Sequence, residues 1–315
     1  MACRFLCPIL AIAAFCGCLH AGTAAEITAE RSDGGAIVKI DGQLFTEYLI
    51  HSGTKPVLWP IIGPTGKTVT RDYPMAERAG EKTDHPHHRS LWFSHGRVGG
   101  ADFWLEAGTH GTIKHLEFTR IAGGNPAVVA TKNAWLAPNG KKVCEDQRTL
   151  RFGADNKARW IDFDITLKAG DQPLTFGDTK EGAFGIRVAE SISVDAKQGG
   201  KMVNSRGQVN DAAWGQPAEW IDYHGPLEGK TVGIAVLNHP SSFRYPTRWH
   251  ARPYGLLAAN PFCLREFTGN QSADGAATLK AGDRITLRYR VLLHGGDERE
   301  GRVAEAFSAY SKERP

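Results

Sequence analysis

The chain has 315 residues, and its 38 Lys and Arg against 34 Asp and Glu give a formal net charge of +4 at pH 7. The basic residues are interspersed with acidic ones, which argues against a nucleic acid partner, because phosphate tracking needs a concentrated positive face. No segment approaches the roughly 18 consecutive apolar residues that a membrane-spanning helix needs, so we expect no membrane span.

The first 25 residues are typical of an export signal. Arg4 is the only Lys, Arg, Asp or Glu before Glu26, and an apolar stretch followed by small residues leads to Ala25. We expect cleavage near Ala25 and a periplasmic or secreted mature protein. A lipoprotein acylated at Cys16 or Cys18 is the less favoured alternative.

Residues 26–315 are predicted to form a single all-β domain, a large antiparallel β-sandwich with one C-terminal helix. Short runs rich in Val, Ile, Phe, Trp and Thr recur, and each is closed by Gly, Pro, Asn or Asp. The predicted strands span residues 36–40, 44–50, 113–121, 126–136, 143–152, 159–168, 184–193, 219–223, 232–237 and 284–293.

Turn and helix signals complete this prediction. Asp41 and Gly42 mark one hairpin, and the Pro-Asn-Gly sequence at 138–140 marks another. Apolar residues spaced to cover one face predict a helix over 302–312. Segments 65–104 and 238–262 show no clear periodicity and are predicted to be long loops. Because loops on a rigid scaffold tend to carry function, we expect the site there.

The densest chemical signal is a histidine cluster. Four histidines fall within eleven residues, namely His85, His87, His88 and His95. Pro86 favours an extended conformation at His85. In an extended chain His85, His87 and Arg89 point to one side, and His88 points to the other. Two imidazoles and a guanidinium on one face suit an anion, an array of sugar hydroxyls or a metal ion.

Further candidate side chains are Trp, Arg, Asp and amide groups that could contact a substrate. Arginine fixes planar or anionic groups with two hydrogen bonds, and aromatic rings offer flat contact area. Besides Arg89, the candidate substrate-binding residues are Trp92, Asp102, Trp104, Asp178, Arg187, Arg244, Tyr245, Trp249, His250, Tyr254 and Asn260.

Glu181 is the first choice for a catalytic base, because it lies in a glycine-punctuated turn entering a strand. Acid–base catalysis needs one group that removes a proton and another that donates one. The imidazoles proposed as its partners are those of His87, His239 and His85.

Cofactor use stays unknown from the sequence. Beyond the signal only Cys144 and Cys263 remain, which form one disulfide or stay as buried free thiols. No Cys-x-x-Cys spacing exists, so a metal ion would need His and carboxylate ligands. For a divalent metal bound by His, the candidate ligands are His85, His87, His95 and His250.

Several motifs resemble a family of exported bacterial proteins that carries the label methane oxygenase PmoA. These motifs are Asp84-His85-Pro86-His87-His88-Arg89, Leu91-Trp92-Phe93, Asp102-Phe103-Trp104, Lys180-Glu181-Gly182, Phe243-Arg244-Tyr245-Pro246-Thr247 and Trp249-His250. The resemblance implies a galactose-mutarotase-like supersandwich, in which a His acid and a Glu base act on a sugar in the concave face. His87 or His239 and Glu181 would fill those parts. The label itself implies copper-dependent methane oxidation.

Three functions fit these observations. The favoured one is a carbohydrate-active enzyme, an epimerase, lyase or hydrolase of a sugar or glycoside, with a small molecule or oligosaccharide as substrate. The second is a His-ligated metal-dependent enzyme. The third is a sugar-binding module without catalytic activity.

Overall fold

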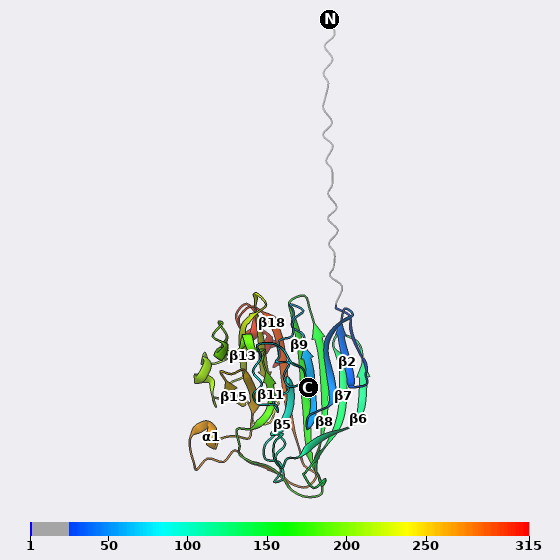
Figure 1. Cartoon of the computed structure of the whole chain (residues 1–315), viewed down its shortest axis with the longest axis vertical. Helices are drawn as coiled ribbons and strands as arrows, with labels where there is room; N and C mark the ends of the chain where they lie inside the picture. Colours follow the sequence, from blue (N-terminus) through cyan, green and yellow to red (C-terminus); the bar gives the residue numbers. More distant parts are fainter. Residues whose placement is uncertain (2–24, 315) are drawn as a thin grey trace.

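The computed structural model describes Met1 and residues 25–314, so the interior of the predicted export signal lies outside the described residues. Two eight-stranded antiparallel sheets pack face to face (Figure 1). In spatial order, the first sheet holds β1 (Ile27–Arg31), β2 (Gly35–Ile40), β3 (Gln43–Ser52), β4 (Lys55–Ile61), β5 (Leu91–His95), β11 (Gly182–Arg187), β16 (Leu256–Asn260) and β15 (Arg248–Arg252).

The second sheet has its own strand order. It holds β12 (Lys201–Asn204), β13 (Trp220–Leu227), β14 (Lys230–Asn238), β18 (Arg284–Gly295), β9 (Ala158–Ala169), β8 (Lys142–Ala154), β7 (Ala127–Leu136) and β6 (Thr112–Ala122). β10 (Leu174–Phe176) and β17 (Ala277–Leu279) form a separate pair. The short 3-10 helices are η1 (Glu190–Ile192), η2 (Val194–Ala196) and η3 (Asn210–Ala213). The predicted antiparallel β-sandwich is confirmed.

The core lies between the two sheets, where alternate side chains of both meet. The ring of Phe184 on β11 lies 4.9 Å from that of Phe163 on β9 and stacks at 4.8 Å on Tyr289 of β18. Burying each such side chain contributes roughly 1.5–3 kcal/mol. One contiguous core therefore joins the two sheets, while the prediction of a single domain over 26–315 stays a prediction.

The hairpin between β2 and β3 follows the sequence signal. Its two turn residues, Asp41 and Gly42, have φ angles of 50° and 75°. Two-residue turns with both φ angles positive match the twist of paired strands, and Asp-Gly adopts them at low cost. The hairpin from β7 to β8 also forms as predicted.

Both segments predicted as loops contain strands of the first sheet. β5 lies within 65–104, and β15 and β16 lie within 238–262. All five residues of β5 and of β16 are buried. A strand covered on both faces shows no apolar–polar alternation, so its sequence lacks the period-two signal. In the sheet, β5, β11, β16 and β15 are consecutive, which brings the two segments close together.

Helix α2 (Val303–Tyr310) confirms the predicted C-terminal helix and packs on the outer face of the second sheet. The structure adds a one-turn helix, α1 (Arg265–Thr268), at one end of the molecule (Figure 1). Among the described residues no helix is long and apolar enough to cross a membrane.

The two cysteines of the described region are both buried and free, so the structure contains the thiols rather than the disulfide. Burial raises the pKa of the Cys263 thiol to about 12, and it also raises the pKa of Cys144. Neither thiol is therefore a reactive thiolate near neutral pH.

Candidate functional site

The floor of the candidate site is the outer face of the first sheet. Leu91 and Phe93 of β5 point into the core, so Trp92 between them points outward. Trp92 is paired with Gly185 of β11, where an added Cβ would lie 2.6 Å from the indole. The indole therefore lies across the glycine, and Trp104 packs beside it with ring centroids 5.1 Å apart.

A group of nearly parallel rings covers this floor. The imidazole of His88 lies 5.3 Å above Trp92, and His85 lies 4.8 Å from His88 with only 5° between the rings. Tyr254, from the turn between β15 and β16, lies nearly parallel to both imidazoles, 5.0 Å from His85 and 6.2 Å from His88. We call Trp92, His88, His85 and Tyr254 the ring column.

The ring column corrects the expectation of an extended chain at His85. Its φ angle is 44°, and the His88 N–H donates to the His85 carbonyl at 2.9 Å to close a turn. The turn aligns His85 with His88, whereas an extended chain would point them to opposite sides. His87 instead packs edge-on to His88, with ring centroids 4.4 Å apart.

Asp84 lies beside His85 and binds two buried arginines. The guanidinium groups of Arg71 and Arg187 are fully buried, and both donate to the same oxygen of Asp84. Burial raises the pKa of Asp84, but Arg187 and Arg71 together hold it below its ordinary value. Arg187 also donates to the His88 Nδ1 at 3.3 Å, so this nitrogen carries a lone pair. The surroundings of the column therefore carry net positive charge.

His87 lies beside a second buried ion cluster. Arg89 and Lys55 both bind the carboxylate of Glu106, with N–O distances of 2.7 Å. Burial, together with the positive charge of Lys55, lowers the pKa of His87 to about 4. His87 is therefore a neutral imidazole at pH 7, able to accept a proton. Arg89, predicted to bind substrate, is held by Glu106.

The site continues from Tyr254 towards β15 through cation–π contacts. The guanidinium of Arg252 lies 5.7 Å from the Tyr254 ring and 4.9 Å from the Trp214 ring. Trp214 in turn packs edge-on against His250, with centroids 4.9 Å apart. This contact chain joins the two segments of the sequence that were expected to form one pocket.

His250 is fixed in a neutral form. Burial lowers its pKa to about 3, so at pH 7 its Nδ1–H donates to the Lys180 carbonyl at 2.8 Å. The Asn260 amide donates to the same carbonyl at 3.1 Å and to that of Thr179 at 2.9 Å. Together they hold the segment that leads to Glu181.

Glu181 is the acidic group of this half of the site. Its side chain is 28 % exposed and lies 3.3 Å from the Lys180 ammonium. Burial raises the pKa of Glu181, although Lys180 opposes the shift. Burial also raises the pKa of Tyr254; the charges of Arg252 and Arg187 oppose this shift, and those of Glu181 and Asp84 add to it. Carboxylates from both halves of the site therefore contribute to the pKa of Tyr254.

The structure brings most of the predicted side chains to this face and changes the role of several. Those gathered here are His85, His87, Arg89, Trp92, Trp104, Glu181, Arg187, His250, Tyr254 and Asn260. Trp92 and Trp104 were expected to stack on a ligand, but both are buried. Their indole N–H groups have no hydrogen-bond partner among the described residues.

Five residues that contribute to the site were not predicted from the sequence. They are Lys55, Arg71, Glu106, Trp214 and Arg252. Each is an isolated residue in the sequence, and its role depends on a partner that folding brings close. The nearest sequence signal is at Arg252, two residues before Tyr254 in the segment already marked by its aromatic and basic composition.

His239 lies on the other side of the sandwich. Its ring packs against Tyr310 of α2 at 5.0 Å, and its Nε2 lies 3.1 Å from the Glu313 carbonyl. Helix α2 covers the outer face of the second sheet, so both sheets separate His239 from Glu181. The structure does not bring this predicted pair together.

His95 and Trp249 point into the core because of strand alternation. The His95 Nε2 lies 2.8 Å from the Gly177 carbonyl, and its ring packs on Phe262 at 5.0 Å. Burial lowers the pKa of His95 to about 4. The Trp249 indole donates to the Ala218 carbonyl at 3.0 Å. Both residues therefore lie inside the sandwich, away from the ring column.

Of the other four predicted substrate-binding residues, three form hydrogen bonds with main-chain groups and one lies elsewhere. Asp178 accepts from the backbone N–H groups of Leu264, Arg265 and Gly275, and Asp102 accepts from those of Trp104 and Leu105. Arg244 donates to the carbonyls of Pro261, Gly275 and Ala276. Tyr245 lies near Glu219, and burial together with the Glu219 charge raises the pKa of Tyr245.

The predicted metal ligands His85, His87, His95 and His250 do not form a three-ligand group. Within residues 25–314, three ligand atoms of His, Cys, Asp or Glu converge within 4.8 Å only at Asp222, His224 and Glu298. Binding of a metal ion by the predicted histidines is untested and stays a prediction.

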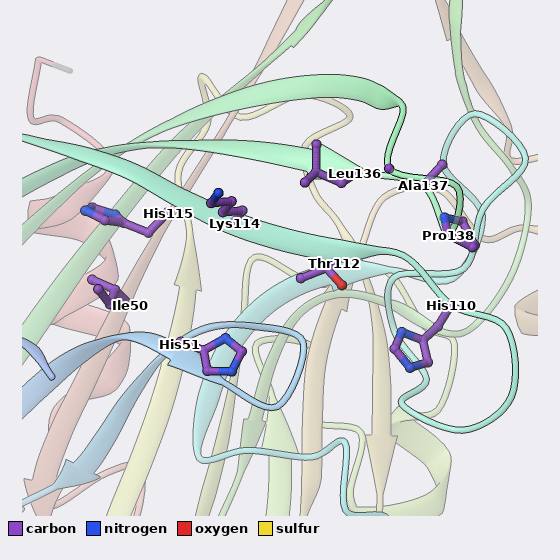
Figure 2. Close-up of a pocket in the computed structure, with 10 residues that line it drawn as sticks. Ile50, His51, His110, Thr112, Lys114, His115, Leu136, Ala137 and Pro138 are labelled. Atoms are coloured by element: carbon purple, nitrogen blue, oxygen red, sulfur yellow. The ribbon is translucent and has the colours of Figure 1, made fainter.

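A separate cavity of about 690 Å³ opens between β3 and β6. Figure 2 shows His51 at the end of β3 and Thr112, Lys114 and His115 along β6, with His110 in the adjoining loop. None of the predicted site residues lines it. It is distinct from the ring column, which is built on β5, β11, β16 and β15.

A comparison with protein-family models identifies the family to which the chain belongs. Residues 36–308 match the model of a family of unknown function, DUF6807. The chain belongs to this family. The match includes every residue of the ring column and Glu181, so the site described above lies within the family region. No curated protein matches the chain.

Three solved structures that resemble this DUF6807 chain share at most 12 % of its residues. A galactose mutarotase-like protein from Lactobacillus casei is 10 % identical with a TM-score of 0.39, over 85 % of this chain and 100 % of that one. A putative aldose 1-epimerase from Escherichia coli is 12 % identical with a TM-score of 0.33, over 87 % and 99 %. The galactosidase domain of an alpha-galactosidase-sucrose kinase is 10 % identical with a TM-score of 0.42, over 86 % and 40 %. The chain thus spans about 40 % of the glycosidase it matches.

Proposed function

We propose that this protein is an exported carbohydrate-active enzyme whose site is the outer face of the first sheet, around the ring column. The observation that carries the proposal is the contact chain from His85 through Tyr254, Arg252 and Trp214 to His250. Along this chain lie the half-buried rings of Tyr254 and Trp214 and the neutral imidazole of His250, which donates to the carbonyl of Lys180, the residue before Glu181. Such a combination suits a sugar, which offers hydroxyl groups around an apolar ring face.

Acid–base chemistry is the reaction type that the protonation states support. Glu181 has a raised pKa, which brings a carboxyl group closer to the working pH and improves it as a proton-transfer group. His87 is neutral at pH 7 because burial lowers its pKa to about 4. Glu181 would be the base that removes a proton and returns it, and the N–H of the neutral His87 imidazole would donate a hydrogen bond to the oxygen on which charge develops. A sugar isomerase or lyase can use this pairing.

The experiment separates binding from turnover. Wild-type protein is screened by calorimetry and by product analysis against a panel of mono- and oligosaccharides, including 3-keto-sugars. For a sugar that is converted, we expect Glu181→Gln to lower kcat at least 100-fold and leave affinity within about threefold, as for loss of a general acid or base.

A matched pair of histidine variants supplies the control. His87→Asn removes an imidazole of the site, whereas His239→Asn removes one behind the second sheet. We expect loss of turnover in the first and wild-type turnover in the second. If wild-type protein binds a sugar but does not convert it, the protein is a sugar-binding module rather than an enzyme. If that sugar binds equally well to a Tyr254→Ala variant, the binding site lies elsewhere.

A further inference from the structure

A second cluster of ionisable side chains lies on the opposite side of the molecule from the ring column. Asp222 and His224 lie on β13, His294 lies near the end of β18, and Glu298 lies in the turn before α2. Asp222 is fully buried, and the side chains of His224 and Glu298 are 8 % and 12 % exposed. Buried charged groups need partners, so this cluster requires an explanation.

Strand register builds the cluster. His224 is paired with Gly233 of β14, and Gly233 is paired with His294. Directly paired residues project from the same face, so the two imidazoles flank the glycine on the outer face of the second sheet. A Cβ added at Gly233 or at Gly301 would lie 2.1 Å from the His294 ring. The two glycines therefore create the space that the ring occupies.

One polar atom of this cluster lacks a partner. Each oxygen of Asp222 lies next to an imidazole nitrogen, at 2.6 Å for His224 Nδ1 and 2.8 Å for His294 Nε2. The Oε2 of Glu298 is buried, lies 3.8 Å from His224 Nδ1 and accepts no hydrogen bond within the described chain. A buried acceptor without a donor costs about 1–3 kcal/mol. A cation near Asp222, His224 and Glu298 would satisfy it.

We propose that Asp222, His224 and Glu298 bind a divalent transition-metal ion of the zinc type. One imidazole nitrogen with two carboxylate oxygens is a donor set that such ions accept, whereas Ca²⁺ and Mg²⁺ favour oxygen ligands alone. His294 is a positioning residue, because its hydrogen bond orients the carboxylate of Asp222. Since Glu298 precedes α2, the ion would tie the start of this helix to the sheet.

The first test uses the wild-type protein. Chelator-treated protein is titrated with Zn²⁺ by calorimetry, and its thermal midpoint is measured with and without the ion. We expect one equivalent to bind and, at free Zn²⁺ 100 times Kd, an unfolding constant about 100-fold lower, seen as a higher midpoint. If neither heat nor shift appears, the cluster is only an ion-pair network and the proposal is wrong.

Variants then locate the ion. We expect Glu298→Gln and His224→Asn to weaken Zn²⁺ binding at least 100-fold, and His294→Gln to weaken it about 10–100-fold. The matched control Glu305→Gln, on the exposed face of α2, should bind like wild type. Binding that survives Glu298→Gln but disappears in His87→Asn would assign the ion to the ring column instead and overturn the proposal. If a cluster variant does not fold, the titration of the wild-type protein still shows whether Zn²⁺ binds.

Discussion

The ring of Tyr254 lies stacked on the imidazole of His85, with centroids 5.0 Å apart and an angle of 11° between the planes. The two residues are 169 positions apart in the sequence, so the contact exists only because β5, β11, β16 and β15 are neighbours in the first sheet. Tyr254 also contacts Arg187 and Arg252 through its ring. This tyrosine therefore links the two halves of the candidate site.

Replacing this ring tests whether it supports the site. We expect Tyr254→Ala to weaken sugar affinity at least 10-fold, because His85 and Arg252 lose the surface that positions them. Tyr254→Phe keeps the ring and should bind within about twofold of wild type. Affinity is measured by calorimetry on the sugar found for wild-type protein. Equal losses in both variants would show that the phenol oxygen, rather than the ring, contributes.

The pH dependence of turnover tests Glu181 as the base. A base works when deprotonated, so the rate should rise with pH through the raised pKa of Glu181. Removing the neighbouring positive charge in Lys180→Met should move this rise to higher pH. Removing the negative charge of Glu266 in Glu266→Gln should move it to lower pH, because Glu266 raises the pKa of Glu181. A profile unchanged in both variants would exclude Glu181 as the titrating group.

Asp84 is expected to stabilise the fold through the two arginines that it joins. Asp84→Asn leaves the buried guanidinium groups of Arg71 and Arg187 without a carboxylate. The Asp84 side chain is 35 % exposed while both guanidinium groups are buried, so we expect the free energy of unfolding to fall by about 1–3 kcal/mol. Urea unfolding measures the change. Glu117→Gln, which breaks an exposed pair with Lys132, should leave stability unchanged.

The glycine beneath Trp92 gives a packing test. In Gly185→Ala the added Cβ would lie 2.6 Å from the indole, so the ring must shift. Such overpacking costs about 1–3 kcal/mol. Gly170→Ala is the matched control, because no atom lies within 4 Å of its added Cβ. Both variants are compared by urea unfolding, and equal stabilities would show that the floor adjusts freely.

His95 should make the protein less stable in acid. Its pKa is lowered to about 4 by burial, so between pH 6.5 and 4 the unfolded chain binds a proton that the folded chain does not. Stability is therefore lost as the pH falls through this window, by up to about 3 kcal/mol at 1.36 kcal/mol for each pH unit. His95→Gln should show a shallower loss in urea unfolding at a series of pH values. Parallel curves for the two proteins would contradict this role.

Much of the architecture could be predicted from local patterns. The hairpin at Asp41 and Gly42 depends only on turn residues that accept positive φ angles. Long strands such as β9, which alternate between a core face and a half-exposed face, carry a period-two signal. These features depend on near neighbours in the chain, so the sequence shows them directly.

The candidate site could be predicted only in part. The histidine cluster and Glu181 are visible as composition and turn signals. The roles of Lys55, Arg71 and Arg252 are not, because each depends on a partner many residues away. The direction of His95 was also hidden, since its strand is buried on both faces and shows no alternation.

The sequence by itself therefore determined the antiparallel β class, the hairpins, the terminal helix and the segments that hold the polar aromatic residues. Only the tertiary structure decided which of those residues meet, because strand order is set by packing between distant segments. It separated His239 from Glu181 by two sheets and joined His85 to Tyr254. Local sequence encodes conformation, whereas burial and long-range pairing select the neighbours that make a site.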